Sequence, residues 1–485
     1  MNSKIKRNFI LNTAFQVLRL ITPLVVTPHI SRVLGADGVG IFSYTYSIVY
    51  YFTLFAVLGT TTYGAREIAR VQDKPEERSH LFWEIWLLAA TTSVISMVGW
   101  GVFVLINSQY RLYYMILTLY ILAAMADISW FFTGLEKFPA VVGKNIAVRL
   151  AEVALTLWLV QKPQHLVLYC AIMAGGTFFG NLSLWIGVGK SLVKVNFSKL
   201  RPYRHLKGTL IYFVPTIATS VYTMLDKTLI GMITRDTAEN GYYEQATKIV
   251  NVAKAITFTS LNMVVGPRSV HLYAQGKFDE VKKMLHTSLN FMLLMAFGIS
   301  FGIAGIADLF VPWFFGDGFL EVTLLLKVLA PIIIVISVSN TLGYQYYDPA
   351  GLRSKSANYI IVGAGCNLCL NLLLIPYLKS AGAIIGSVAA ESVITALYLK
   401  NCDGFLKLRS VLQMSWKRLI AGAVMFGFLQ WRTPAYNSVM LDIAWLVVQA
   451  MAVYFAVLLI VQDKFLIDFL KSYYSKIKTK LSKQQ

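Results

Sequence analysis

Apolar runs of about twenty residues, the length that a membrane-spanning helix needs, follow one another along almost the whole chain. In a hydrocarbon core only helices and closed barrels satisfy the hydrogen bonds of the backbone. Of the 485 residues, 56% are hydrophobic and 14% are charged, whereas an average soluble domain has about 25% charged residues. The sequence therefore predicts an all-α polytopic membrane protein and argues against a water-soluble enzyme.

The apolar runs divide into about fourteen predicted transmembrane helices. Their ranges are 9–30, 40–64, 81–106, 112–133, 144–161, 165–189, 208–230, 242–266, 287–308, 320–345, 356–376, 382–399, 416–431 and 439–461. The connections between them are short, so the chain has no room for a separate catalytic domain.

The net charge of +20 is compatible with nucleic-acid binding, but the positions of the cations favour another explanation. Most Lys and Arg residues fall in the even-numbered connections and in both tails. The outer connections contain only a few: Arg32, Arg111, Lys162, Arg235, Lys379 and Arg432. This asymmetry follows the positive-inside rule and predicts that both termini are cytoplasmic. We expect no nucleic-acid partner.

Six cations lie inside the predicted spans rather than in loops: Arg19, Arg149, Lys227, Lys248, Lys254 and Lys327. At 1.5 Å per residue, Arg19 and Lys254 lie about 15 and 18 Å from a span end, near the midplane. A central Arg or Lys costs about 2.5 to 3.5 kcal/mol unless it faces protein or water. An aqueous cavity that accepts an anion explains them, and the alternative is pairing with acids: Arg19 with Asp127, Lys327 with Glu391, or Arg149 with Glu152.

Polar residues around these cations recur on one helical face. In 9–30 the face contains Asn12, Gln16, Arg19 and Pro23, and in 242–266 it contains Glu244, Lys248, Asn251 and Asn262. The span 40–64 begins with a hydroxyl-rich and aromatic stretch that can hydrogen-bond to sugars and stack on them: Tyr44, Tyr46 and Tyr50. We therefore predict a polar cavity wall.

An internal repeat predicts the arrangement of the spans. Gly40 and Arg66 recur as Gly241 and Arg268 at nearly the same separation. An offset of six spans gives both copies the same orientation in the membrane, as in parallel transporter repeats. The predicted organisation is an N-lobe at 1–205, a C-lobe at 206–405, two further helices at 406–463 and a basic cytoplasmic tail at 464–485.

The sequence resembles a known family of membrane transporters through two groups of residues. The first group is Asn12-Thr13, Gln16, Pro23-Leu24, Pro28, Arg32, Leu34-Gly35, Gly40, Gly59, Gly64, Arg66-Glu67 and Ala69. The second is Pro215, Asp226-Lys227, Gly231, Gly241, Tyr243, Ala246 and Pro267-Arg268. Both are similar to the Wzx-like polysaccharide flippases of the multidrug/oligosaccharidyl-lipid/polysaccharide (MOP) exporter superfamily, which includes the MATE-like exporters.

This resemblance implies a V-shaped transporter with two pseudo-symmetric six-helix lobes. Its expected substrate is an undecaprenyl-pyrophosphate-linked oligosaccharide repeat unit, moved from the cytoplasmic to the outer leaflet for capsule, O-antigen or exopolysaccharide synthesis. It also implies a bacterial plasma (inner) membrane location and a functional link to polymerase and export proteins. We expect a monomer.

The resemblance and the buried cations together predict the mechanism. The pyrophosphate would bind Arg19, Lys254, Lys227, Lys248, Lys327 and Arg149 by charge-assisted hydrogen bonds. No nucleotide, metal or cofactor motif is present, so a proton or sodium gradient would drive alternating access. The candidates for ion coupling are Asp127, Asp226, Glu152 and Glu391.

Three other functions remain open from the sequence. A lipid II flippase for peptidoglycan would share the cationic cavity. A cation-coupled multidrug antiporter would favour an acidic cavity, and a membrane glycosyltransferase would need a larger outer loop than this chain has.

Overall fold

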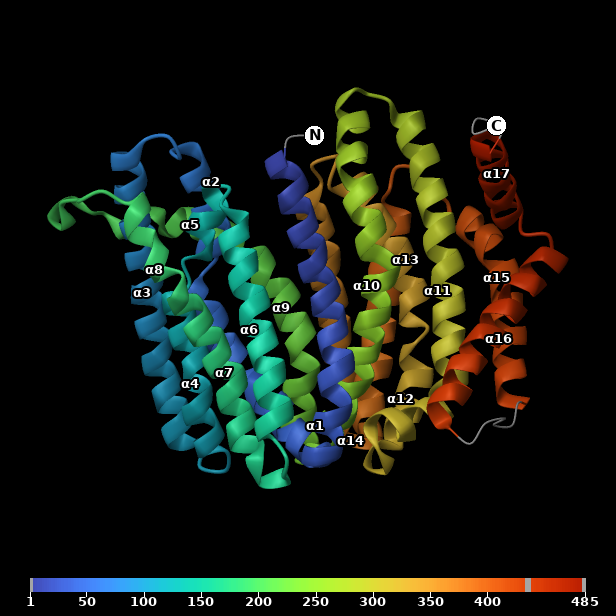
Figure 1. The fold of residues 1–485 in the computed structure, drawn as a ribbon, viewed down its shortest axis with the longest axis horizontal. Coiled ribbons are helices and arrows are strands. Elements are labelled where there is room, and N and C mark those ends of the chain that lie inside the picture. The colour runs from blue at the N-terminus through green and yellow to red at the C-terminus, as the bar shows by residue number, and fades with distance from the viewer. Residues whose placement is uncertain (1–2, 432–437, 482–485) are drawn as a thin grey trace. The chain divides into compact units, whose positions relative to one another are not determined.

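The computed structural model (Figure 1) describes residues 3–431 and 438–481. Within these ranges the side chains are described except at 3–17, 19, 20, 138, 140, 214, 215, 218, 219, 221, 222, 260 and 473–481. All regular elements of the described chain are helices, which confirms the predicted all-α fold. The chain divides into two compact units, Met1–Glu244 and Gln245–Gln485.

The first unit contains nine complete α-helices and the beginning of a tenth. They are α1 (Ser3–Val57), α2 (Thr60–Arg70), α3 (Pro75–Ile106), α4 (Arg111–Ala126), α5 (Ser129–Gly134), α6 (Phe138–Leu159), α7 (Leu166–Ser183), α8 (Trp185–Val188), α9 (Leu206–Thr234) and the first residues of α10 (Thr237–Ala274). Helix α9, which the sequence assigned to the second lobe, falls in this unit. The lobe boundary at 205/206 stays a prediction.

The second unit contains the rest of α10 and seven further α-helices. They are α11 (Phe278–Phe315), α12 (Glu321–Leu329), α13 (Ile332–Leu342), α14 (Arg353–Lys400), α15 (Leu408–Trp431), α16 (Val439–Ile460) and α17 (Lys464–Leu481). A π-helical turn, Gly343–Tyr347, follows α13. The main apolar core of this unit lies among α11, α13, α14, α15 and α16.

Local sequence explains where the long helices break. Gly35, inside α1, has φ +68°, which glycine adopts without a steric penalty, and it separates the predicted spans 9–30 and 40–64. Lys379 breaks α14 with φ 49° between the spans 356–376 and 382–399. Helix α3 begins with Pro75, which needs no N–H partner at that position, and Glu76 and Glu77 there complement the helix dipole.

The helices present apolar side chains on their outer surfaces. Ile106 is 75% exposed and Ile186 is 87% exposed, as is normal for residues that contact lipid rather than water. Eight helices of the described chain are long and apolar enough to span a membrane, or nine if the bent helix α10 is counted. In this number the kinked helices α1 and α14 count once each, and the total of about fourteen spans stays a prediction.

A polar network fixes the connection before α9. Glu84 of α3 is buried and accepts hydrogen bonds from Arg201 N (2.8 Å), Arg204 Nη2 (2.5 Å) and His205 Nε2 (2.9 Å). The other ring nitrogen of His205 lies 2.8 Å from the hydroxyl of Tyr63 on α2. The network therefore ties α2, α3 and the turn at Pro202–His205 together.

The two glycines of the internal repeat pack against each other's helices. A Cβ on Gly40 would lie 1.7 Å from the carbonyl oxygen of Thr237, and one on Gly241 would lie 2.2 Å from that of Ala36. Residues 36 and 237 correspond in the repeat, as do 40 and 241. The two contacts are therefore equivalent, as they would be around a two-fold axis.

Candidate functional site

The first unit contains a buried ion pair between two of its helices. Lys227 of α9 lies 2.6 Å from Glu244 of α10, and each side chain is 15% exposed. Ser43 of α1 donates a 2.9 Å hydrogen bond to the same Glu244 oxygen. Three helices therefore meet at one carboxylate.

Glu244 was not among the predicted site residues, although it lies on the predicted polar face of 242–266. Its spacing of four from Lys248 was visible in the sequence, but its pairing with Lys227 depends on how α9 and α10 pack.

The residues next to Lys227 and Glu244 in the sequence also make hydrogen bonds. The hydroxyl of Tyr243 donates a 2.5 Å hydrogen bond to the buried carboxylate of Asp226. Thr228 Oγ1 lies 2.9 Å from Ser47 Oγ and 3.2 Å from the hydroxyl of Tyr51. The predicted coupling candidate Asp226 is thus hydrogen-bonded to a tyrosine.

A second ion pair in this unit lies within α6. Arg149 Nη1 lies 2.9 Å from Glu152 Oε2, with 8% of the Glu152 side chain exposed. This agrees with the alternative that the sequence left open for Arg149. The hydroxyl of Tyr46 on α1 lies in electrostatic range of both Arg149 and Glu244, so the two ion pairs belong to one polar region.

We call this region the first-unit polar site and define it as Ser43, Tyr46, Arg149, Glu152, Lys227 and Glu244. It combines two cations with two carboxylates, and an anion can bind there by replacing a carboxylate at its cation. The structure thus brings together four predicted site residues, Tyr46, Arg149, Glu152 and Lys227.

The predicted sugar-facing tyrosines pack largely against protein. The Tyr46 ring lies 5.2 Å from that of Tyr120 and 6.0 Å from that of Tyr50. The Tyr50 hydroxyl donates a 3.2 Å hydrogen bond to Ser220 of α9. Tyr44 lies against Gly231 of α9, where any Cβ would overlap its ring.

The second unit contains another group of predicted residues on α10. Lys254 is in electrostatic range of Glu391 on α14. Asn262 donates a 2.9 Å hydrogen bond to Asn340 of α13. Lys248 is half-buried and Asn251 is exposed. The structure therefore brings the predicted cation Lys254 close to the predicted coupling acid Glu391.

The alternative pairing of Lys327 with Glu391 is wrong. Lys327 of α12 binds Asp308 of α11 instead, with Nζ 2.7 and 2.8 Å from the two carboxylate oxygens. The Asp308 side chain is 53% exposed, so this pair lies at the periphery of the unit. The cause is helix packing, since α12 lies beside both α11 and α14 and the nearer carboxylate comes from α11.

Asp127 has a local structural partner. Its Oδ1 accepts a 2.9 Å hydrogen bond from Ser129 N at the beginning of α5. The side chains of Asn12, Gln16 and Arg19 lie outside the described residues, so their contacts, including the alternative pair of Arg19 with Asp127, stay predictions. The roles of all predicted site residues in binding or coupling stay predictions as well.

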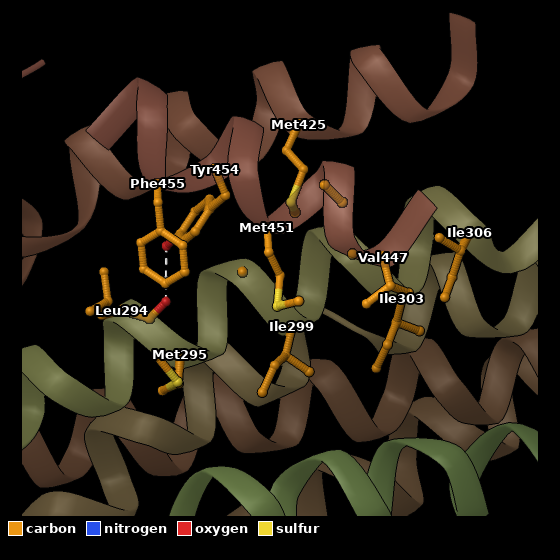
Figure 2. Close-up of a pocket in the computed structure, with 13 residues that line it drawn as sticks. Leu294, Met295, Ile299, Ile303, Ile306, Met425, Val447, Met451, Tyr454 and Phe455 are labelled. Atoms are coloured by element: carbon orange, nitrogen blue, oxygen red, sulfur yellow. Dashed lines mark hydrogen bonds between the residues drawn. The ribbon is translucent and has the colours of Figure 1, made fainter. Parts of the chain in front are cut away.

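An apolar cavity of about 280 Å³ lies between α11, α15 and α16 of the second unit (Figure 2). Met295, Ile299 and Ile303 of α11 face Met425 of α15 and Met451 of α16. The hydroxyl of Tyr454 is satisfied by a 2.9 Å hydrogen bond to Leu294 O. The cavity can therefore make dispersion contacts with an apolar chain. The hydroxyl of Tyr454 is already hydrogen-bonded and is not free to bind a polar group.

These features define the class of the protein: it is a membrane protein of many helices, with ion pairs buried among the helices. The chain belongs to the family described as polysaccharide biosynthesis protein, whose sequence pattern it matches over residues 5–273.

The chain is similar in sequence to two curated proteins from different organisms. It is 23% identical over 402 residues to the "putative O-antigen transporter" of Escherichia coli (strain K12), which covers 81% of this chain and 96% of that protein. It is 22% identical over 248 residues to the "probable low-salt glycan biosynthesis flippase Agl15" of Haloferax volcanii, covering 49% of this chain and 52% of that one.

Two solved structures share the fold. One is the lipid II flippase MurJ in an inward closed conformation, with a TM-score of 0.73 and 13% identity over 96% of this chain and 99% of MurJ. The other is an inward-facing MATE-family multidrug transporter of the MOP superfamily, with a TM-score of 0.61 and 12% identity over 86% of this chain and 95% of that one. At these identities the similarity establishes the MOP-type fold alone.

Proposed function

We propose that this protein is a flippase that moves lipid-linked oligosaccharides across the plasma membrane. The observation that carries the proposal is the family membership, together with similarity over most of the chain to a protein named as an O-antigen transporter. Buried cations support it, because a lipid-linked pyrophosphate cannot cross hydrocarbon without charge-assisted hydrogen bonds.

The proposed substrate is an oligosaccharide repeat unit on undecaprenyl pyrophosphate. Lys227 and Arg149 of the first-unit polar site are the described cations of that unit that we assign to its phosphates. In the second unit, Lys254 is a separate candidate for phosphate binding. Each of them lies near a carboxylate, so the anion would exchange with Glu244, Glu152 or Glu391. The apolar cavity in Figure 2 could hold part of the polyprenyl chain, because apolar side chains line it.

The energy source in this proposal is a proton or sodium gradient acting through alternating access. A carboxylate released from its cation by the substrate is a suitable site for a coupling ion. Polymerase and export proteins would use the product at the outer leaflet. Both termini would be cytoplasmic, as the distribution of Lys and Arg predicts.

The test is head-group transfer between leaflets of proteoliposomes. The substrate is a fluorescent oligosaccharide on polyprenyl pyrophosphate, and lipid II is supplied in a parallel assay. The variant Lys254→Met is compared with Lys355→Met, which changes an exposed lysine of α14.

We expect the wild type and Lys355→Met to transfer the oligosaccharide lipid, and Lys254→Met to transfer at least about tenfold less, which corresponds to ~1.4 kcal/mol. Transfer of lipid II alone would show the peptidoglycan function instead. Failure to transfer either lipid under proton and sodium gradients would refute the proposal.

A further inference from the structure

The second unit contains a second, larger groove that the transport proposal does not use. It has a volume of about 810 Å³ and lies between the end of α10, the beginning of α11 and the C-terminal helix α17. Its apolar lining includes Leu261, Val265, Phe291 and Phe469, and its charged lining is Arg268, Glu280, Lys283 and Asp468. We call it the α17 groove.

Helix α17, which forms one wall of this groove, has its main described contacts at its first turn. Asp463 Oδ1 caps its first turn by accepting a 2.9 Å hydrogen bond from Leu466 N, and the Leu466 side chain is buried. The other Asp463 oxygen lies 3.4 Å from Nε of the buried Arg418 on α15, which also donates a 2.9 Å hydrogen bond to Asn290 of α11. These contacts therefore connect the beginning of α17 to α15 and α11.

The lining of the groove changes from apolar residues at one end to charged residues at the other. Leu261, Val265 and Phe291 lie within the predicted spans 242–266 and 287–308. Arg268, Glu280 and Lys283 lie in the connection between these spans, beyond the apolar runs. The groove thus crosses from the hydrocarbon region to the aqueous surface, where a phospholipid places its acyl chains and its head group.

The charged end of the groove carries both signs. Within the described part of the chain, the side chains of Arg268 and Lys283 make no ion pair or hydrogen bond, and both are exposed. Glu280 has a 3.8 Å contact with Lys277, and both side chains are more than half exposed. Such an exposed pair contributes little and exchanges readily. Asp468 of α17 is exposed as well, so two cations and two carboxylates are available to a ligand.

We propose that the α17 groove binds one phospholipid with a primary-amine, zwitterionic head group, as in phosphatidylethanolamine. Its phosphate binds Arg268 and Lys283, its ammonium group binds Glu280 and Asp468, and its acyl chains lie along the apolar wall. Phosphatidylglycerol offers the same phosphate but no cation for the two carboxylates. Phosphatidylcholine has a cation without N–H donors.

The first test uses the unmodified full-length protein. It is reconstituted in nanodiscs with equal amounts of the three phospholipids and analysed by native mass spectrometry. Photo-crosslinking with a phosphatidylethanolamine that carries a diazirine on its acyl chain then maps the site. We expect phosphatidylethanolamine to be retained about tenfold over the other two lipids, with crosslinks in residues 261–291 and 465–472. Equal retention of the three lipids, or crosslinks elsewhere, would overturn the proposal.

The second test exchanges the charges. Arg268→Ala with Lys283→Ala should lower the retention of phosphatidylethanolamine about tenfold, and Glu280→Gln with Asp468→Asn should shift the preference towards phosphatidylglycerol. Lys355→Ala, an exposed lysine of α14, is the control and should change neither. Unchanged retention in both double variants refutes the assignment. Since no step of these assays involves transport, their outcome is independent of the proposed flippase function.

Discussion

Replacing Lys227 by Met tests whether its ion pair with Glu244 serves only the fold or also the substrate. The two groups lie 2.6 Å apart and each side chain is 15% exposed. Removing one partner of a buried pair leaves an uncompensated charge and costs about 3 to 5 kcal/mol. We therefore expect Lys227→Met to lower the thermal unfolding temperature in detergent, while Lys207→Met, an exposed lysine on the same helix, should not.

The double variant Lys227→Met/Glu244→Gln separates stability from function. It removes both charges and keeps side chains of similar length, and a neutral replacement of a buried pair is often nearly neutral for stability. We expect the unfolding temperature to return close to that of the wild type, so that the second substitution recovers most of the about 3 to 5 kcal/mol lost in Lys227→Met. If Lys227 binds the substrate phosphate, head-group transfer in proteoliposomes should stay low.

Two outcomes would refute this reasoning. Full recovery of transfer in the double variant would show that Lys227 is only the counter-ion of Glu244. Unchanged stability in the single variant Lys227→Met would show that the ion pair contributes nothing to the fold. Measuring unfolding and transfer on the same preparations keeps the two explanations apart.

Three further predictions concern the structural contacts. Gly40→Ala should lower the unfolding temperature and transfer, because its Cβ would lie 1.7 Å from Thr237 O and overpacking costs about 1 to 3 kcal/mol, whereas Gly143→Ala has open space and should be tolerated. Arg418→Leu should expose α17 to limited proteolysis, since it removes the ion pair that holds this helix, and the exposed Arg409→Leu should not. Glu84→Ala should destabilise the protein by roughly 3 to 5 kcal/mol in equilibrium unfolding, because it leaves buried donors unpaired. An unfolding curve equal to that of the wild type would contradict the first or the third prediction.

The fold was predictable because the membrane limits what each segment can do. Every predicted span lies largely within a helix or a pair of consecutive helices, and the breaks at Gly35 and Lys379 fall between predicted spans. Apolar length alone defines such segments, since the thickness of the bilayer sets the number of residues. The bent or kinked helices are less visible in the sequence, because packing determines whether two spans join into one long helix.

The contacts of the site were predictable only where they are local. The pair Arg149 and Glu152 follows from a spacing of three residues on one helix. The partner of Lys327 was predicted wrongly, because Asp308 and Glu391 come from two helices and only their packing shows which carboxylate is nearer. Glu244 was visible as part of a polar face, but its role as the counter-ion of Lys227 depends on how α9 lies against α10.

The acids beside the cations explain how a cationic site can exist in a membrane without its substrate. An isolated Lys in hydrocarbon costs about 2.5 to 3.5 kcal/mol, whereas two opposite charges 4 Å apart attract by ~4 kcal/mol at an effective dielectric constant of 20. Glu244 thus stabilises Lys227 through their ion pair, and in the proposed mechanism a pyrophosphate with more than one charge would displace it. In the proposed mechanism the displaced carboxylate would need a proton or a metal cation, which would link substrate binding to ion binding. On this reasoning the counter-ion Glu244, rather than the cation Lys227, would determine the dependence on the gradient. Transfer by Glu244→Gln, which keeps Lys227, measured with and without a proton gradient tests that link.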